Sequence, residues 1–246
     1  MEEYFKWKII LDYVVPLGIL SIVGIVCLIY IACQTVKDIR VAHFFEKNGY
    51  IMELDRYMFE EVCRYLQTRN AAKKEKLMIS INISRRHFQN PAFLEEYAEI
   101  KERYGIADGQ IELELTESVF FNEEQIALVK QAVFRMHQLG FRCSLDDFGS
   151  GFSSLGLLKS FDVDAIKLDR IFFEDIAQKK AQDILCCLIE LAHRLHIQVV
   201  AEGIETEEQL DFLRTTTCDM VQGYYYARPL PAAEYTAWLE QFHSVE

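Results

Sequence analysis

Acidic, amide and lysine side chains stand at the ends of successive β-branched runs in this sequence, and they are the residues best suited to chemistry. The first run ends at Asn82, and the third ends at the adjacent pair Asp146 and Asp147. The other members of the set, in chain order, are Glu114, Glu117, Lys167, Asp169, Glu202, Glu205 and Gln222. In a parallel α/β barrel the carboxyl ends of the strands meet on one face, so we expect these side chains to converge.

Several carboxylates and an amide at one mouth predict a site for divalent cations. Like charges held together raise one another's pKa values unless cations lie among them. Oxygen ligands suit Mg²⁺ or Mn²⁺, and two such ions about 3.5–4 Å apart are a recurrent device for phosphoester hydrolysis. If the strand is still extended there, Asp146 and Asp147 point in different directions, and one of them could bridge two ions. Lys167 could neutralise a phosphate or hold the attacking water.

Each member of the set also has a simpler explanation. A single acidic residue at a strand end is more often a helix cap or a surface charge. Glu202 and Glu205 could merely favour the start of the following helix, and Lys167 could be an ordinary paired lysine. The joint occurrence of these residues at successive strand ends favours a site. The residues alone therefore predict an acidic metal site for a phosphorylated ligand.

β-Branched runs alternate with helical patterns, which predicts a parallel sheet with helices packed outside it. The predicted strands are Leu77–Ile83, Ile111–Leu115, Arg142–Asp146, Asp164–Leu168, Ile197–Ala201 and Asp219–Gly223. The predicted helices are His43–Arg69, Pro91–Tyr104, Asn122–Leu139, Asp183–Leu195 and Glu207–Arg214. Helix-start signals are Asn90 before Pro91, and Thr206 ahead of Gln209. Six strands fall short of the eight in a closed (β/α)8 barrel, and no repeat is evident in the residues themselves.

An uncharged segment of 21 residues, from Tyr13 to Cys33, predicts one transmembrane helix. At about 1.5 Å per residue it reaches roughly 31 Å, close to the ~30 Å hydrocarbon core of a bilayer. A secretory signal peptide would have a shorter apolar region behind a basic start, whereas here acidic residues offset Lys6 and Lys8. Tyr30 departs from the aliphatic residue of a lipoprotein cleavage box. A buried hairpin is disfavoured because the segment is long and uniformly apolar, and the flanking charges leave the orientation undecided.

Composition excludes several classes of protein. The 246 residues include 26 Lys+Arg against 38 Asp+Glu, so the formal net charge is −12. That charge argues against a DNA- or RNA-binding protein, because such affinity depends on basic residues that neutralise phosphates. A hydrophobic content of 51% with only four prolines argues against disorder. The seven cysteines are odd in number and form no CxxC, so neither a disulfide framework nor a zinc cluster is expected.

The stretch from about residue 41 to residue 240 resembles the EAL domain, the bacterial phosphodiesterase family that hydrolyses cyclic di-GMP. The resemblance rests on motifs that occur in the family's order and with similar spacing. They are Ile81–Ser84 (INIS), Glu112–Ser118 (ELELTES), Asp146–Leu155 (DDFGSGFSSL), Ile166–Arg170 (IKLDR), Val199–Thr206 (VVAEGIET), Gln222–Tyr224 (QGY) and Arg228–Pro231 (RPLP). Each motif alone is moderately specific, whereas the ordered set is very specific.

The resemblance implies a TIM-like (β/α) barrel of EAL type with a two-metal site that holds Mg²⁺ or Mn²⁺. The residues that match metal-ligand positions are Asn82, Glu114, Asp146, Asp147 and Glu202. The residues that match catalytic positions are Lys167, which would help to hold the attacking water, Glu202, Glu117 and Gln222; Glu205 matches a supporting carboxylate. Glu117 would steady the loop Phe148–Leu155, which the family links to homodimer contacts. The implied reaction is attack of water on one phosphodiester bond of cyclic di-GMP to give linear pGpG.

The Glu-Ala-Leu motif that names the family, and the arginine that follows it, do not occur in residues 1–76. Val41–Leu66 resembles the helical region that comes after the motif strand, so we expect the first two strands of the barrel to be missing. The site then loses a metal-coordinating Glu and a phosphate-binding Arg, which predicts impaired turnover. The barrel also loses its closure, which leaves two strand edges to be covered by another chain or by the N-terminal segment.

Two functions from different classes stay open. One is a membrane-anchored cyclic di-GMP phosphodiesterase of impaired activity; the other is a catalytically inactive cyclic di-GMP receptor or protein-interaction scaffold at the membrane. A truncated or decayed gene product is a third reading. The expected organisation is a short N-terminal segment (1–12), a transmembrane helix (13–33), a linker (34–42) and an incomplete EAL domain (43–246). Because cyclic di-GMP is cytoplasmic, we expect a single span in the inner membrane with the EAL domain in the cytoplasm.

Overall fold

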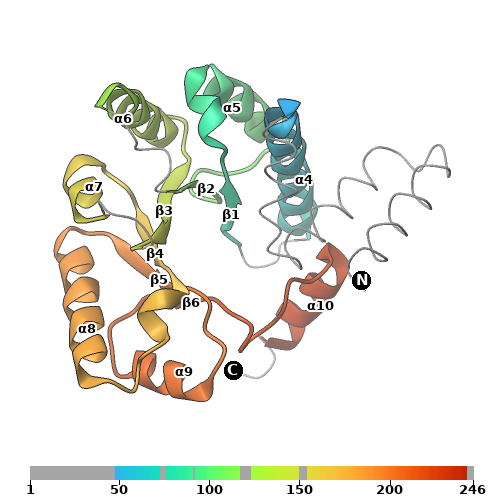
Figure 1. Cartoon of the computed structure of the whole chain (residues 1–246). Helices are drawn as coiled ribbons and strands as arrows, with labels where there is room; N and C mark the ends of the chain where they lie inside the picture. Colours follow the sequence, from blue (N-terminus) through green and yellow to red (C-terminus); the bar gives the residue numbers. More distant parts are fainter. Residues whose placement is uncertain (1–47, 73–75, 91, 117–122, 150–153, 243–246) are drawn as a thin grey trace, which may run out of the picture. The chain divides into compact units, whose positions relative to one another are not determined.

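The computed structural model describes residues 48–72, 76–90, 92–116, 123–149 and 154–242 (Figure 1). The chain divides into two compact units, one of residues 55–227 and the other of residues 1–54 together with 228–246. The smaller unit contributes α10 (Ala232–Phe242) and the start of α4 (Ile51–Ala71). The larger unit contains the rest of α4 and the whole sheet, and it is the part that positions the candidate site.

The sheet consists of parallel strands that pair in chain order. In the described residues these are β1 (Ile79–Asn82), β2 (Ile111–Thr116), β3 (Arg142–Phe148), β4 (Ala165–Leu168), β5 (Gln198–Ala201) and β6 (Met220–Val221). The helices α5 (Phe93–Arg103), α6 (Glu123–Gln138), α7 (Ser154–Ser160), α8 (Lys179–Arg194) and α9 (Glu207–Arg214) lie around the outside of the curved sheet (Figure 1). Two short 3₁₀ helices, η1 (Arg85–Gln89) and η3 (Arg170–Phe173), follow β1 and β4. The predicted parallel α/β architecture is confirmed, in the form of a half-barrel.

The two faces of the sheet differ in chemistry. Successive side chains of a strand point to opposite faces, and the outward positions are apolar and fully buried, as Leu113, Leu145 and Val199 show. The inward positions carry polar groups: Glu114 stands in register with Ser144, and both are buried. The outer face therefore packs against the helices, while the concave face gathers the charged side chains.

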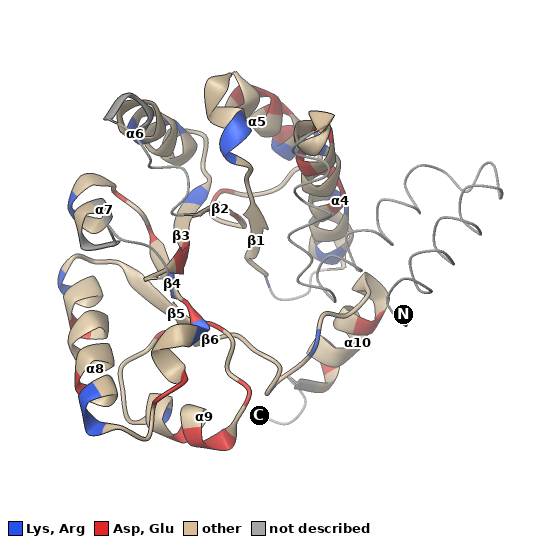
Figure 2. Cartoon of the chain, in the orientation of Figure 1, with Lys and Arg blue, Asp and Glu red and all other residues tan. Residues whose placement is uncertain are grey.

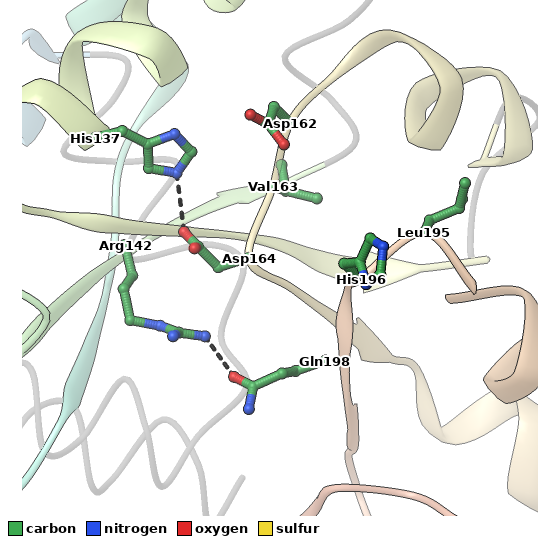
Figure 3. Close-up of a pocket in the computed structure, with 8 residues that line it drawn as sticks. All are labelled: His137, Arg142, Asp162, Val163, Asp164, Leu195, His196 and Gln198. Carbon is green, nitrogen blue, oxygen red and sulfur yellow. Dashed lines mark hydrogen bonds and ion pairs between the residues drawn. The ribbon is translucent and has the colours of Figure 1, made fainter. Parts of the chain in front are cut away.

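A chain of polar contacts crosses the concave face near the amino ends of the strands. Ser80 Oγ donates to Glu112 Oε1 at 2.9 Å, and Arg142 Nε donates to Glu112 Oε2 at 3.4 Å. Arg142 Nη2 in turn donates to Gln198 Oε1 (Figure 3). Glu112 is 1% exposed, so this buried carboxylate depends on Arg142 for its compensating charge.

Two helix ends are fastened to the sheet by the same arrangement of groups. Asp164, just before β4, accepts hydrogen bonds from Cys143 N at 2.8 Å and from the ring of His137, at the end of α6, at 2.9 Å (Figure 3). Asp219, just before β6, accepts from Val199 N and from the ring of His193, at the end of α8, both at 2.8 Å. We call these groups the Asp164 clamp and the Asp219 clamp. The residues of one clamp lie 55 or 56 positions from those of the other, so the half-barrel repeats a unit of two strands and two helices that the sequence does not reveal.

The ends of the helices correct some predictions and confirm others. Asn90 is not the N-cap of α5: the helix starts after Ala92, whose N–H bonds to Asn90 Oδ1 at 3.3 Å in the turn before it. The side chain of Asn90 accepts its hydrogen bond within this turn, and it does not accept one from the first N–H groups of the helix. Thr206 and Gln209 form the predicted capping box of α9. Helix α8 begins at Lys179, before the predicted Asp183, and α7 was not predicted.

The predicted transmembrane helix, residues 13–33, lies outside the described part of the chain. Among the residues that the structure describes, no helix is long and apolar enough to cross a membrane. Helix α4 occupies the later part of the predicted helix His43–Arg69, and residues 43–47 are likewise outside the described part.

Candidate functional site

Lys167 is the centre of a charged cluster at the carboxyl ends of the strands. Its Nζ lies 2.5 Å from Glu114 Oε1 on β2 and 2.7 Å from Glu202 Oε1, which follows β5. Asp146 Oδ1 on β3 is 3.8 Å away. Figure 2 shows acidic positions on β3 close to basic positions near β4, at the centre of the curved sheet. The structure thus brings together four residues that the sequence placed on four separate strand ends.

Burial and mutual repulsion shift the proton affinities of these groups. Glu114 is 4% exposed, and its burial raises its pKa to about 7, with Lys167 opposing the shift and the charges of Asp146 and Glu202 adding to it. Burial also raises the pKa of Glu202. Burial of Lys167 disfavours its ammonium, but the surrounding carboxylates outweigh that effect and raise its pKa. One ammonium among several carboxylates leaves an excess of negative charge, which a further cation would compensate.

The backbone turns at Asp147, so the condition under which the two aspartates would point in different directions, an extended strand at this position, is not met. Asp147 has a φ of +53°, and the register between β3 and β4 shifts between Leu145 and Phe148. Such a left-handed residue is costly outside glycine and is found where the surroundings impose it. The consequence is that Asp146, Asp147 and Glu202 each direct an oxygen into one group whose atoms all lie within 4.8 Å of one another. The two aspartates therefore converge on one place and do not diverge.

The carboxyl group of Asp147 is affected by its neighbours although the residue as a whole is exposed. Partial desolvation of the carboxyl raises its pKa to about 6, and the negative charges of Asp146, Asp169 and Glu202 add to the rise. The group is thus poised to lose its proton when a cation arrives.

The remaining predicted residues lie around this cluster or outside the described part. Asn82 ends β1 in register with Glu114, and its side chain is exposed. Gln222 follows β6, and its N–H donates to Ala201 O at 2.8 Å, beside Glu202. Glu205 is exposed, and its N–H donates to Gln209 Oε1 at the start of α9, so it belongs to the helix start. Glu117 and residues 150–153 of the loop Phe148–Leu155 lie outside the described residues.

Two glycines shape the site in a way that the sequence analysis did not identify. Gly149 has a φ of +97°, and a Cβ there would lie 2.2 Å from the ring of Phe172. Gly203 has a φ of +67°, and its Cβ would lie 2.7 Å from Arg170 Cβ. Each glycine comes one or two residues after an acidic residue of the site. The glycines in Asp-Phe-Gly and in Glu-Gly are therefore the sequence feature from which these turns could have been predicted.

The donor set fits a hard divalent cation. Asp146, Asp147 and Glu202 offer only carboxylate oxygens, which Mg²⁺, Mn²⁺ and Ca²⁺ prefer. Glu114 is linked to this group by Lys167, whose ammonium contacts both Glu114 and Glu202. Neither a thiolate nor an imidazole belongs to the group that the structure describes. The arrangement can therefore concentrate cations, and through them a phosphate, at the carboxyl end of the sheet.

Fold and site together define a parallel α/β half-barrel with an acidic cluster at the carboxyl ends of its strands that could hold a metal ion. The EAL domain family matches residues 27–229, so the chain belongs to the EAL domain family. It is 37% identical over 199 residues to the cyclic di-GMP phosphodiesterase NbdA of Pseudomonas aeruginosa, a match that covers 80% of this chain and 25% of that protein. The chain spans about a quarter of the length of the curated relatives it matches first.

Solved EAL structures share the fold. The EAL domain of Mycobacterium smegmatis DcpA superposes with a TM-score of 0.72 at 31% identity, over 77% of this chain and 85% of that chain. The PaMucR phosphodiesterase in complex with c-di-GMP gives a TM-score of 0.68 at 28% identity, over 78% of this chain and 77% of that chain. The family predicted from the sequence motifs is confirmed.

Proposed function

We propose that this chain is a divalent-metal-dependent cyclic di-GMP phosphodiesterase whose turnover is weakened. The observation that carries the proposal is the convergence of Asp146, Asp147 and Glu202 within 4.8 Å, next to the buried pair of Lys167 and Glu114. Four separate strand ends contribute to it, which a collection of unrelated surface charges would not do. Relatives and solved structures that carry cyclic di-GMP in their names support the choice of ligand.

The residues of the chain would divide the work as follows. Asp146, Asp147, Glu202 and Glu114 would hold Mg²⁺ or Mn²⁺, and such an ion would supply polarisation of a phosphodiester and activation of a water. Lys167 keeps its proton because its pKa is raised, so it acts as a hydrogen-bond donor and not as a general base. Its contacts with Glu114 and Glu202 fix both carboxylates. Water attacks one phosphorus, one P–O bond of the ring breaks, and the proton passes to the leaving oxygen, giving linear pGpG.

The proposal of weakened turnover rests on the lack of a Glu-Ala-Leu motif in residues 1–76. This segment therefore holds neither the motif's glutamate nor the arginine after it. Loss of one metal ligand and one phosphate contact removes charge stabilisation that is needed most in the transition state. The same observation favours the second candidate, a receptor that binds cyclic di-GMP without hydrolysing it.

Membrane attachment and self-association belong to the same proposal. The uncharged segment 13–33 would anchor the chain in the inner membrane, with the EAL domain in the cytoplasm where cyclic di-GMP occurs. The loop Phe148–Leu155 would take part in a homodimer. These two points are supported by the sequence and by the family resemblance.

One experiment separates the two candidate functions. The full chain in detergent is equilibrated with labelled cyclic di-GMP and Mn²⁺, and the bound and free nucleotides are identified by chromatography. The enzyme proposal expects pGpG to appear with the wild type and with Asp162→Ala, an exposed aspartate at the amino end of β4, and to vanish with Asp146→Ala. Binding without conversion establishes the receptor. A folded wild type that neither binds nor converts the nucleotide refutes both.

A further inference from the structure

We propose that Arg170 is a substrate-binding residue that contacts a phosphate of the nucleotide at the rim of the acidic site. The inference rests on the proposed function, and it assigns to an arginine of this chain the phosphate contact that the absent motif would have supplied. Three observations support the inference. They are the close packing of Arg170 against Gly203, the contacts of the preceding residues with the loops of Asp147 and Glu202, and the exposure of the Arg170 guanidinium.

Gly203 allows Arg170 to pack closely against the loop that follows Glu202. A Cβ on residue 203 would lie 2.7 Å from Arg170 Cβ, which is closer than side chains pack, and 3.6 Å from Arg170 Cα, which is an ordinary contact distance. Gly203 also has a φ of +67°, which other residues rarely adopt. Only glycine therefore lets the Cβ of Arg170 come this close to the residue that follows the metal-ligand candidate Glu202.

The neighbours of Arg170 connect it to two of the candidate metal ligands. Asp169 caps η3 by accepting from Ile171 N at 2.8 Å, and its carboxylate is near enough to Asp147 to help raise the pKa of that residue. On the other side, Glu202 N donates to Leu168 O at 3.0 Å. Arg170 is the first residue of η3. It directly follows Leu168 and Asp169, which lie next to Glu202 and Asp147 respectively.

The guanidinium of Arg170 is available for a ligand. The residue is exposed, and it makes no ion pair or hydrogen bond with another described side chain. Lys167, in contrast, is buried and already engaged by three carboxylates. A cyclic dinucleotide carries two negative phosphates, and the planar guanidinium binds phosphate oxygens in pairs. An exposed arginine at an acidic rim suits a ligand whose phosphate is bound on one side by cations and on the other by a donor group.

The test compares two exposed arginines, Arg170 at the proposed site and Arg194 at the end of α8, where it pairs with Glu190. Arg170→Met removes the charge and keeps an unbranched stem, and Arg170→Lys restores the charge. Arg194→Met removes an exposed positive charge from the last residue of α8. For each full-length variant in detergent we would measure the Kd of cyclic di-GMP with Mn²⁺, the KM and kcat where pGpG forms, and the Kd of Mn²⁺ alone.

We expect Arg170→Met to raise the Kd or KM for the nucleotide about tenfold, in keeping with the loss of one charged hydrogen-bond contact. Arg170→Lys should recover part of that loss, while Arg194→Met and the affinity for Mn²⁺ should stay within about twofold of wild type. An unchanged nucleotide affinity in Arg170→Met overturns the role of Arg170 and leaves the proposed function intact. A parallel loss of Mn²⁺ affinity also overturns it, because the residue would then act on the metal site. Absence of nucleotide binding by the wild type overturns both proposals.

Discussion

At the scale of single residues, the decisive feature is that Lys167 compensates several carboxylates at once. It is 5% exposed and lies within 4.0 Å of Glu114, Asp146 and Glu202. Buried charges are tolerated only when they are paired and hydrogen-bonded. Lys167 is therefore as necessary to the fold of this region as to any chemistry, and a substitution there has to be judged by stability as well as activity.

We expect Lys167→Met to lower the free energy of unfolding by about 3–5 kcal/mol at pH 8, because the ion pair loses one buried partner. Mn²⁺ should recover part of the loss, since a cation can replace the ammonium among the carboxylates. Denaturant unfolding with and without Mn²⁺ measures both effects. Lys159→Met, at an exposed lysine of α7, serves as the control. A loss below about 1 kcal/mol would show that the cluster is hydrated and that burial is not what holds Lys167 in place.

The raised pKa values of Glu114 and Asp147, about 7 and about 6, predict how cation binding depends on pH. A carboxylate has to lose its proton before it coordinates a metal. The affinity for Mn²⁺ should therefore rise steeply between pH 5 and pH 6, by up to about tenfold per pH unit for each proton displaced, and level off above pH 7. Titration calorimetry across this range measures it, and Glu114→Gln should level off nearer pH 6. A flat profile would contradict the assignment of these ligands.

The stability of the metal-free protein should change in the opposite direction. Folding raises the pKa of Glu114 from 4.5 to about 7, so the folded state holds a proton that the unfolded state releases. That contribution to stability is complete below pH 4.5 and is lost as the pH rises through 7. Stabilisation by Mn²⁺ should accordingly be largest at alkaline pH, where the uncompensated charge is greatest.

At the scale of secondary-structure elements, the Asp164 and Asp219 clamps explain how helices and strands are held in register at the amino ends. Each carboxylate satisfies a buried strand N–H and the imidazole of a helix end at the same time. Because the strand N–H has no alternative partner once the carboxylate is gone, its desolvation is the larger part of the energy.

We expect Asp164→Ala to cost about 1–3 kcal/mol of stability, since Cys143 N would be left unsatisfied in the core. His137→Ala removes only a partly exposed partner of the same carboxylate and should cost less than about 1 kcal/mol. Chemical denaturation of both variants gives the comparison. Equal losses would show that the imidazole contact, and not the strand N–H, carries the energy of the clamp.

Local patterns predicted the elements well where local physics decides them. Thr206 and Gln209 form a capping box because both partners lie within one helical turn, and the strand Ile111–Leu115 is recognisable from its β-branched and apolar residues. The conformation at Asp147 was left open by the sequence, because its positive φ occurs where the register between β3 and β4 shifts, and that shift depends on residues far apart in the chain. The repeat of the clamps was missed for a related reason: it lies in contacts between residues far apart in sequence.

At the scale of the whole molecule, the half-barrel places apolar side chains outside and charges inside the curve of its sheet. The order β1 to β6 leaves β1 and β6 paired on one side only, among the strands that the structure describes. The positions of the candidate site residues could be predicted because parallel strands end on one face, whereas the distances that make Lys167 the centre could not, since they depend on the curvature of the sheet. The topology of the sheet thus determines which residues meet at the candidate site, and side-chain packing determines the distances between them.

The larger unit should open as one cooperative body that includes residues 55–71 of α4. Cys63 on α4 and Cys143 on β3 are both fully buried in the same core, and burial raises the pKa of Cys63 to about 12 and that of Cys143 well above its ordinary value. The ring of Phe59 stacks on Tyr97 at 4.2 Å and meets Phe141 edge-on at 5.9 Å, which ties α4 to the start of β3. Contacts of this kind make local opening of α4 expensive.

This cooperativity can be measured by thiol labelling. In variants that keep a single cysteine and carry serine at the other six positions, we expect Cys63 and Cys143 to react with a thiol reagent only through opening, with free energies that agree within about 1 kcal/mol. Cys186, which is exposed on α8, should react at the rate of an unfolded thiol and so calibrates the reagent. A much lower opening free energy at Cys63 than at Cys143 would mean that α4 unfolds separately. The strands that carry Glu114, Asp146 and Lys167 would then hold the candidate site together without it.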